Sequence, residues 1–227
     1  MDEGTPLRIT RREFALTAGA LVASGALFGR IPPAFADATM EELMRPGPLP
    51  DIVVGKADAP VTIIEYASMT CPHCAHFSET TVPSLKTKYI ESGKVRLVFR
   101  EFPLDEVAVA ASMLVRCAAS DASGAVNGDK AMALVDVLFR SQDKWATRNP
   151  VPALQQIGRQ AGVTQKAFEE CLNNQKLYND IVAMRERGSK EYKVESTPTL
   201  FVNGKVQKGG ASIDDLAKLI DPLLPRS

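Results

Sequence analysis

The stretch Val-Thr-Ile-Ile-Glu-Tyr-Ala-Ser-Met-Thr-Cys-Pro-His-Cys, residues 61–74, decides the fold. Its first half, residues 61–67, is a short run of apolar and β-branched side chains, which predicts a buried strand. Its second half places Pro72 where a helix would begin, and proline suits the first helical position because its missing N–H would be unpaired there anyway. The stretch therefore predicts a strand that leads directly into a helix, with Cys71 and Cys74 at the junction.

The residues that follow extend this pattern to a β-α-β unit. The helix is expected to continue to about residue 90, with a bend at Pro83, where a backbone hydrogen bond is lost. Residues 95–102, Val-Arg-Leu-Val-Phe-Arg-Glu-Phe, predict the second strand. In residues 105–192 apolar side chains recur three and four positions apart, which predicts a mostly helical region, with Thr164 capping one of its helices.

The C-terminal part predicts a hairpin and a last helix. Asn203-Gly204 separates two extended runs, residues 199–202 and 205–208, and an Asn-Gly pair in this position is a strong signal for a two-residue turn. Ser212 stands three residues before Asp215, as in a capping box that opens a helix. The order β-α-β, helices, β-β-α favours an α/β protein whose central mixed sheet carries helices on its faces.

The composition argues against a nucleic-acid-binding function. The chain has 227 residues, which suits one globular domain or one domain with an insertion. Lys and Arg together number 27, as do Asp and Glu, so the formal net charge is zero. Binding to nucleic acid requires a basic surface and often aromatic platforms, and aromatic residues make up only 6% of this chain.

The first 36 residues have the three parts of a secretory signal. Arg8, Arg11 and Arg12 give it a positive start. Residues 15–28 form a weakly apolar middle part, and Ala34-Phe35-Ala36 is a small-x-small cleavage site. The apolar part is shorter than the ~20 residues that a membrane-spanning helix needs. We therefore expect residues 1–36 to be a cleaved signal peptide; the alternatives are an uncleaved anchor or an ordinary N-terminal helix.

Two further expectations concern the export route and the segment after the signal. Residues 10–14, Thr-Arg-Arg-Glu-Phe, resemble a twin-arginine export signal, so the periplasm is the expected location. Residues 37–50 contain three prolines and a glycine, and we expect an N-terminal tether without a core of its own.

Cys71 and Cys74 have the spacing and position of a redox-active pair. Cysteines separated by two residues can close a small disulfide ring, and Cys71 stands at the helix N-terminus, where free N–H groups and the helix dipole favour an anion. The thiolate is the nucleophile in thiol–disulfide exchange, and His73 can add positive charge or a hydrogen bond. Cys74 is expected to point inward and to resolve the mixed disulfide.

The pair of cysteines allows three other interpretations. Haem attachment requires His directly after the second cysteine, where this chain has Ala75. A structural zinc site requires further ligands, and only His73 and His76 are nearby. A purely structural disulfide is a third alternative. We expect no metal and no cofactor beyond the redox-active Cys71–Cys74 disulfide.

Two segments together resemble the DsbA family of thiol–disulfide oxidoreductases. They are Glu65-Tyr-Ala-Ser-Met-Thr-Cys-Pro-His-Cys74 and Ser196-Thr-Pro-Thr-Leu-Phe-Val-Asn-Gly204, and the resemblance covers roughly residues 50–225. It implies a thioredoxin-like fold with an inserted all-helical domain. The thioredoxin-like domain would then consist of residues 51–104 and 193–227, and the insertion of residues 105–192.

The resemblance also implies roles for three further residues. Thr197-Pro198 would carry a cis peptide bond that faces the cysteines and offers the backbone of Thr197 to the substrate. Glu65 would be the acidic residue beneath the active site that exchanges a proton with Cys74. Oxidases best known in this family often carry Val before the cis proline, and the Thr197 found here also occurs in isomerases and reductases, so the direction of the reaction stays open.

The second cysteine pair lies on apolar helix faces in the predicted insertion. An even number of cysteines in an exported protein favours a structural disulfide between Cys117 and Cys171, with two buried free thiols as the alternative. Trp145 is expected to pack in the core rather than to contact a substrate.

Our leading hypothesis is a monomeric enzyme that introduces disulfides into exported proteins. Its partners would be reduced or unfolded exported proteins and a membrane protein that re-oxidises it, as the resemblance implies. The enzymatic alternative is a disulfide isomerase or reductase. Family isomerases carry an N-terminal dimerisation domain, for which residues 37–60 are too few. The non-enzymatic alternative is a metal-binding module that uses Cys71, Cys74 and His76.

Overall fold

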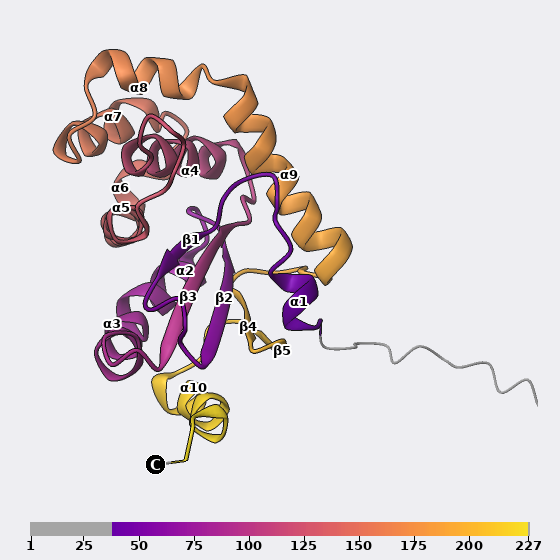
Figure 1. Ribbon diagram of the computed structural model, residues 1–227. Helices are drawn as coiled ribbons and strands as arrows, with labels where there is room; N and C mark the ends of the chain where they lie inside the picture. Colours follow the sequence, from indigo (N-terminus) through magenta and orange to yellow (C-terminus); the bar gives the residue numbers. More distant parts are fainter. Residues whose placement is uncertain (1–37, 227) are drawn as a thin grey trace, which may run out of the picture. The chain divides into compact units, whose positions relative to one another are not determined.

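The computed structural model describes residues 38–226, and their centre is a five-stranded mixed sheet (Figure 1). The strand order is β1-β3-β2-β4-β5, in which only β2 and β3 are parallel. The strands are β1 (Ile52–Val54), β2 (Val61–Ala67), β3 (Val95–Glu101), β4 (Thr199–Val202) and β5 (Lys205–Lys208). The predicted export signal, residues 1–36, lies outside the described residues.

Helices precede, connect and follow these strands. They are α1 (Met40–Leu43), α2 (Pro72–Thr80), α3 (Val82–Leu85), α4 (Glu106–Ala119), α5 (Gly128–Arg140), α6 (Gln142–Trp145), α7 (Val151–Gln160), α8 (Gln165–Leu172), α9 (Gln175–Tyr192) and α10 (Ile213–Ile220). A π-helix, η2 (Lys86–Ile90), follows α3, and a 3-10 helix, η3 (Asp221–Leu223), follows α10. The predicted α/β class is therefore confirmed. No helix within residues 38–226 has the length and apolar character needed to cross a bilayer.

The sheet is covered on both faces, because every residue of β2 is buried. Ile63 belongs to an apolar cluster formed with residues of α2, α3, η2 and α10. The next residue, Ile64, belongs to a second cluster, which contains Leu43 of α1 and Tyr192 of α9. Adjacent residues of a strand point to opposite faces. Both faces of β2 are therefore packed, which explains why the run Val-Thr-Ile-Ile-Glu-Tyr-Ala does not alternate between apolar and polar residues.

The helices between β3 and β4 form the predicted insertion, with one isolated β-bridge between Ser120 and Val126. A third apolar cluster joins them to the loop after β2, and it includes Trp145 together with Met69, Cys71 and Cys74. Trp145 is fully buried and its indole Nε1 donates to the main-chain oxygen of Leu138, which confirms a packing role. The helical layer therefore packs directly behind the residues that carry the two cysteines.

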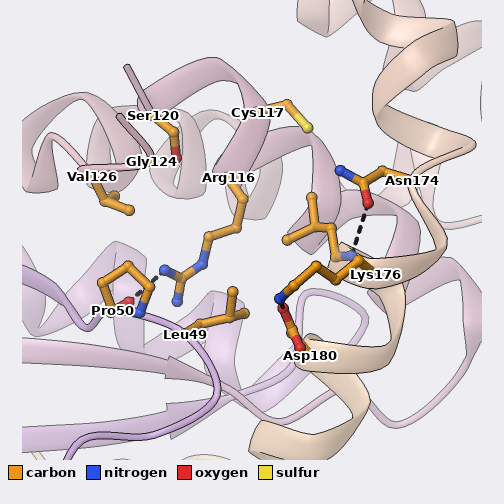
Figure 2. Close-up of a pocket in the computed structure, with 11 residues that line it drawn as sticks. Leu49, Pro50, Arg116, Cys117, Ser120, Gly124, Val126, Asn174, Lys176 and Asp180 are labelled. Carbon is orange, nitrogen blue, oxygen red and sulfur yellow. Dashed lines mark hydrogen bonds and ion pairs between the residues drawn. The ribbon is translucent and has the colours of Figure 1, made fainter. Parts of the chain in front are cut away.

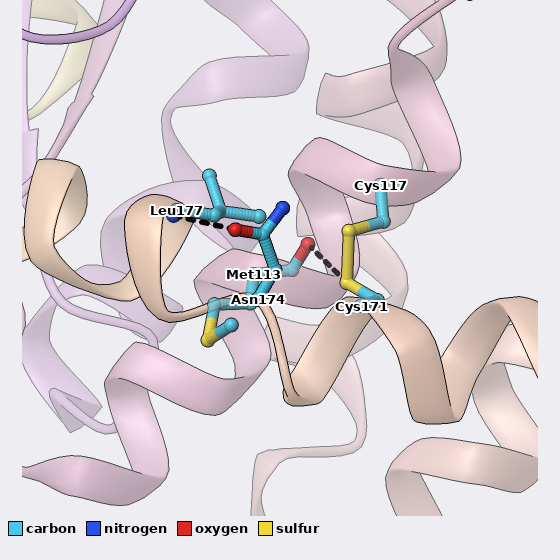
Figure 3. The surroundings of a disulfide bond; sticks show 5 residues. All are labelled: Met113, Cys117, Cys171, Asn174 and Leu177. Carbon is cyan, nitrogen blue, oxygen red and sulfur yellow. Dashed lines mark hydrogen bonds between the residues drawn. A yellow bond between two sulfur atoms is a disulfide. The ribbon is translucent and has the colours of Figure 1, made fainter.

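The disulfide between Cys117 and Cys171 is present, as the sequence favours (Figure 3). It joins α4 to α8, with the two α-carbons 6.1 Å apart. Cys171 is buried, and its sulfur lies 3.2 Å from the main-chain oxygen of Met113 in α4. The bond links two helices of the insertion that are far apart in the sequence.

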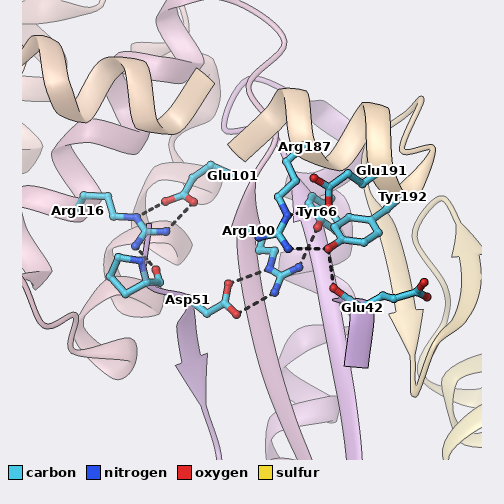
Figure 4. A network of polar contacts seen from close by, with 10 residues as sticks. Glu42, Asp51, Tyr66, Arg100, Glu101, Arg116, Arg187, Glu191 and Tyr192 are labelled. Atoms are coloured by element: carbon cyan, nitrogen blue, oxygen red, sulfur yellow. Dashed lines mark hydrogen bonds and ion pairs between the residues drawn. The ribbon is translucent and has the colours of Figure 1, made fainter. Parts of the chain in front are cut away.

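A network of buried polar contacts ties the segment before β1 to the sheet and to α4 (Figure 4). Arg100 donates to both carboxylate oxygens of Asp51, at 2.8 and 2.9 Å, and to the hydroxyl of Tyr66. Its neighbour Glu101 accepts two hydrogen bonds from Arg116 of α4. These charges can be buried because each is paired.

The predicted local signals and the structure agree at three turns and caps. Asn203 and Gly204 have φ values of 44° and 93°, the left-handed conformation that a two-residue hairpin of this kind requires. The Ser212 hydroxyl accepts from the Asp215 N–H at the start of α10, and the Thr164 hydroxyl accepts from the Ala167 N–H at the start of α8. The helix that begins at Pro72 is interrupted after Thr80, near the expected bend.

Residues 37–50 differ from the prediction. The predicted tether contains a helix, α1, and Leu43 of this helix is fully buried in the core of the sheet rather than in a core of its own. Thr39 and Glu42 make a reciprocal capping box at the start of α1. The hydroxyl of Tyr192 donates to the main-chain oxygen of Glu42, at 2.7 Å, which fixes α1 against the end of α9.

Candidate functional site

Cys71 and Cys74 lie where the chain leaves β2 and enters α2. Cys71 is the N-cap of α2, with an extended backbone, and Pro72 is the first helical residue. The main-chain oxygen of Cys71 accepts from the N–H groups of Cys74 and Ala75, at 3.1 and 3.2 Å. The predicted strand-to-helix junction thus places the first sulfur at the positive end of the helix dipole.

The two thiols have opposite electrostatic environments. A hydrogen bond from the Cys74 thiol, assisted by the N–H groups of Cys74 and His73, lowers the pKa of Cys71 to about 5 against the opposing effect of burial. Burial raises the pKa of Cys74 well above its ordinary value, and the hydrogen bond to Cys71 and the charge of Glu65 act in the same direction. At neutral pH the pair therefore holds a thiolate at Cys71 and a thiol at Cys74.

Glu65 is a buried acid on the strand that leads to the cysteines. Its side chain is 2% exposed, and its Oε1 atom has no hydrogen-bond partner among the residues that the structure describes. Burial, together with the nearby charge of Cys71, raises the pKa of Glu65 to about 8. The carboxyl group can therefore carry a proton at neutral pH, close enough to Cys74 to affect its ionisation.

The loop before β4 faces the first cysteine. The peptide bond between Thr197 and Pro198 is cis, and the Cys71 sulfur lies 3.3 Å from the main-chain oxygen of Thr197. The Pro198 oxygen accepts from the Gly209 N–H, so it is already occupied. The exposed side chain of His73, which belongs to α2, lies beside this loop. The structure therefore brings together the site residues that were predicted at the strand-to-helix junction and those predicted in the loop before β4.

A hollow of about 600 Å³ opens beside the cysteines. It lies between α2 and the loops before β4 and α10, and its lining includes His73, His76, Phe77, Thr197, Gly210 and Ser212. Both histidines of the chain thus line the same hollow. Its lining combines apolar side chains, such as Phe77 and Ile213, with glycines and small hydroxyl side chains. Within residues 38–226 no group of three or more His, Cys, Asp or Glu side chains could hold a metal ion.

A second cavity, of about 260 Å³, lies elsewhere, between the segment before β1, α4 and the start of α9 (Figure 2). Leu49, Arg116 and Asp180 are among its lining residues, with Cys117 at its border. None of the residues around the Cys71 sulfur lines it. It is therefore separate from the hollow beside the cysteine pair.

The sequence did not indicate which residues hold the loop between β2 and α2. The Thr70 hydroxyl donates to Asp105, the N-cap of α4, at 2.8 Å. Gln142, on α6, donates to main-chain oxygens of the same loop. Asp105 has a local signal, since Asp favours helix N-caps, but its contact with Thr70 and the contacts of Gln142 depend on the tertiary arrangement.

Comparison with known proteins agrees with this geometry. The thioredoxin family model matches residues 49–222. The "Putative protein-disulfide oxidoreductase" of Rickettsia bellii is 36% identical over 178 residues, which are 78% of this chain and 66% of that protein, so the match spans slightly less than two thirds of its length. Disulfide bond formation protein D of Bacillus subtilis is 26% identical over 172 residues, covering 74% of this chain and 75% of that protein.

Solved structures show the same similarity. The crystal structure of alpha-DsbA1 from Wolbachia pipientis superposes with a TM-score of 0.72 at 30% identity, covering 82% of this chain and 96% of that one. BdbD from Bacillus subtilis, in its oxidised form, has a TM-score of 0.67 at 22% identity, covering 76% of this chain and 92% of that one, which shows a shared fold.

Proposed function

Because the chain belongs to the DsbA family of thioredoxin-like proteins, we propose that it is an exported thiol–disulfide oxidoreductase that donates its Cys71–Cys74 disulfide to other exported proteins. One observation carries this proposal: the Cys71 sulfur stands at the start of α2 with its pKa lowered to about 5, next to a second thiol. A thiolate that is stable at neutral pH is also a good leaving group, as disulfide exchange requires.

The reaction proceeds in two exchange steps. A substrate thiolate attacks the Cys71 sulfur of the Cys71–Cys74 disulfide; a mixed disulfide forms, and Cys74 leaves and takes up a proton. Glu65, which is protonated at neutral pH, is the nearby acid that can supply it. A second substrate thiolate then attacks the substrate sulfur of the mixed disulfide, and Cys71 leaves as a thiolate. The substrate loses two electrons and the Cys71–Cys74 pair gains them.

The electrostatics favour oxidation of the substrate as the direction of the reaction. Stabilising the Cys71 thiolate stabilises the reduced enzyme, and a more stable reduced form makes the disulfide a stronger oxidant. The alternative, a reductase or isomerase, is suggested by the threonine at position 197. We favour the oxidase because the Cys74 thiol and the N–H groups of His73 and Cys74 stabilise the Cys71 thiolate, whereas the Thr197 hydroxyl has no hydrogen-bond partner among the described residues.

The proposed location and partners follow from the sequence. The signal-like residues 1–36 support export to the periplasm, with a twin-arginine route suggested by residues 10–14. The substrates would be reduced exported proteins, which bind as extended segments in the hollow beside Cys71. A membrane protein would accept the two electrons from the reduced pair and restore the disulfide.

A redox titration tests the direction. The purified protein is equilibrated with mixtures of reduced and oxidised glutathione, and the fraction of Cys71–Cys74 disulfide is measured by alkylation and mass spectrometry. We expect a potential above about −200 mV, in the oxidising range of thioredoxin-like proteins. A potential near −270 mV, typical of a reductase, would reject the oxidase. Zinc that remains bound after purification, and is lost in Cys71→Ser, would instead favour the metal-binding alternative.

A further inference from the structure

Helix α6 is very short, and both of its ends are fixed to other elements. It contains only four residues, Gln142–Trp145. At one end, Trp145 is fully buried in the apolar cluster that also contains Met69 and Cys71. Its indole N–H donates to the Leu138 oxygen at 2.7 Å. Helix α6 is therefore held rigidly within the helical layer.

At the other end, Gln142 reaches the loop that carries the catalytic cysteine. Its amide nitrogen donates to the main-chain oxygen of Met69, at 2.7 Å, and to that of Cys71, at 3.1 Å. The amide group has two N–H donors, so both are used on this loop. The contacts link positions that are 73 and 71 residues apart in sequence, and the side chain is partly buried.

These two oxygens belong to the peptide groups that set the position of the Cys71 sulfur. The thiolate depends on the N–H groups of His73 and Cys74. The Cys71 oxygen also accepts the first hydrogen bonds of α2, from Cys74 and Ala75. A donor on this oxygen therefore orients the sulfur and the helix start together. It also offsets the partial negative charge that a carbonyl oxygen places near a thiolate.

We propose that Gln142 is a positioning residue for Cys71, which acts through the main-chain oxygens of Met69 and Cys71 to keep the sulfur in its thiolate-stabilising geometry. This inference rests on the proposed function, in which Cys71 is the nucleophile. The helical layer would thereby contribute to catalysis, because α6 holds the loop at Cys71 in a fixed position relative to that layer.

The principal test is Gln142→Met, which keeps the approximate size of the side chain and removes the donor. The pKa of Cys71 is measured from the absorbance of the thiolate at 240 nm as a function of pH, on the reduced full-length protein. We expect a rise of roughly half a unit to one unit, the equivalent of one lost hydrogen bond of ordinary strength. The matched control is Asp143→Asn, an exposed change at the next position of α6, which should leave the pKa of Cys71 unchanged.

Two charged variants extend the series. Gln142→Lys keeps a donor and should leave the pKa of Cys71 at or below its wild-type value, whereas Gln142→Glu has no donor and should raise it. Because position 142 is partly buried, salt screens a charge there only weakly, so the uncharged variant Gln142→Leu takes the place of Gln142→Met if that variant fails to fold. An unchanged pKa of Cys71 in Gln142→Met, or in Gln142→Leu where that variant is used, would overturn the proposal.

A failure of the Gln142 proposal can be distinguished from a failure of the proposed oxidase function. If the protein is a reductase, the wild-type protein has a reducing potential, while the order of Cys71 pKa values among the Gln142 variants is unaffected. If Gln142 has no positioning role, the potential of the wild-type protein stays oxidising and the order is lost. Backbone amide exchange at Cys74 and Ala75 provides a second measurement: it should be faster in Gln142→Met and unchanged in Asp143→Asn.

Discussion

The Cys71 sulfur and the main-chain oxygen of Thr197 lie 3.3 Å apart, although 126 positions separate them in the sequence. The antiparallel pairing of β2 with β4, in which Tyr66 lies opposite Thr199, brings the two loops together. A protonated Cys71 donates to this oxygen, whereas a thiolate or a mixed disulfide cannot. The oxygen therefore becomes free to accept a substrate N–H group when Cys71 is ionised or bound to a substrate.

The reactivity of Cys71 should follow its lowered pKa. Because the thiolate is the reacting form, the rate of alkylation by iodoacetamide should rise with a midpoint near pH 5 and stay level above it. Cys74 should remain unmodified in the folded protein over the same range, since it is fully buried and its pKa is raised. Peptide mapping after brief labelling measures both. A midpoint near the ~8.5 of a free cysteine would contradict the assignment.

Glu65→Gln should stabilise the protein in a pH-dependent manner. Burial raises the pKa of Glu65 from 4.5 to about 8, so the folded carboxyl keeps a proton that the unfolded chain releases. The wild-type protein should thus lose free energy of unfolding, relative to the variant, as pH rises from about 4.5 to about 8. With ~1.4 kcal/mol for each pKa unit, the difference above pH 8 is at most about 5 kcal/mol.

This comparison is best made by urea unfolding of the oxidised proteins, in which Cys71 does not titrate. Glu91→Gln, a change at an exposed carboxylate, is the matched control and should show no such pH dependence. If Glu65→Gln and the wild-type protein differed by the same amount at pH 4 and pH 8, Glu65 would not be the buried acid described above.

Removing the second disulfide should weaken the fold and leave the active site intact. Cys117 and Cys171 close a loop with a sequence separation of 54 residues. In the chain-entropy model such a loop contributes about 4 kcal/mol, so Cys117→Ala/Cys171→Ala should lower the free energy of unfolding by up to that amount. Urea unfolding measures the loss. The alkylation midpoint of Cys71 should stay near pH 5, and a shifted midpoint would show that the two sites are coupled.

Removing only one partner of the ion pair between Arg116 and Glu101 should lower the free energy of unfolding strongly. Both side chains are almost completely buried, with 3% and 1% exposure. Arg116→Met leaves an unpaired buried carboxylate and should destabilise the protein by about 3–5 kcal/mol, whereas Arg116→Met/Glu101→Leu should recover much of the loss.

Arg140→Met provides the control for that measurement, because Arg140 pairs with Asp136 on the surface, with 57% and 41% exposure. Exposed ion pairs contribute little to stability, so this variant should unfold close to the wild-type urea concentration. Equal losses in Arg116→Met and Arg140→Met would mean that burial does not govern the cost.

Features set by a few neighbouring residues could be predicted from the sequence. The hairpin at Asn203-Gly204 and the cap at Ser212 depend on backbone preferences within a few positions, and both are present. The strand-to-helix junction at Cys71 is similarly local. The first strand, β1, was missed because it has only three residues, too few for an alternating pattern to show.

Features that depend on contacts distant in sequence could not be predicted in the same way. The charged residues Arg100 and Glu101 suggested no buried pairing, because their partners come from the segment before β1 and from α4. Helix α1 was hidden by the prolines that follow it, although Leu43 is fully buried. Gln142 is an ordinary polar residue in sequence and gains its role only when α6 packs against the loop at Cys71.

The burial of Leu43 has a practical consequence for anyone who shortens this chain. A truncation that begins at residue 51, where the sequence suggests that the domain starts, would remove α1 and uncover the aromatic side chains of Tyr66, Tyr192 and Phe201. Such a fragment would expose an apolar patch to solvent and would therefore aggregate during purification. Expression vectors for the folded body should therefore begin ahead of Thr39, so that the capping box of α1 is retained.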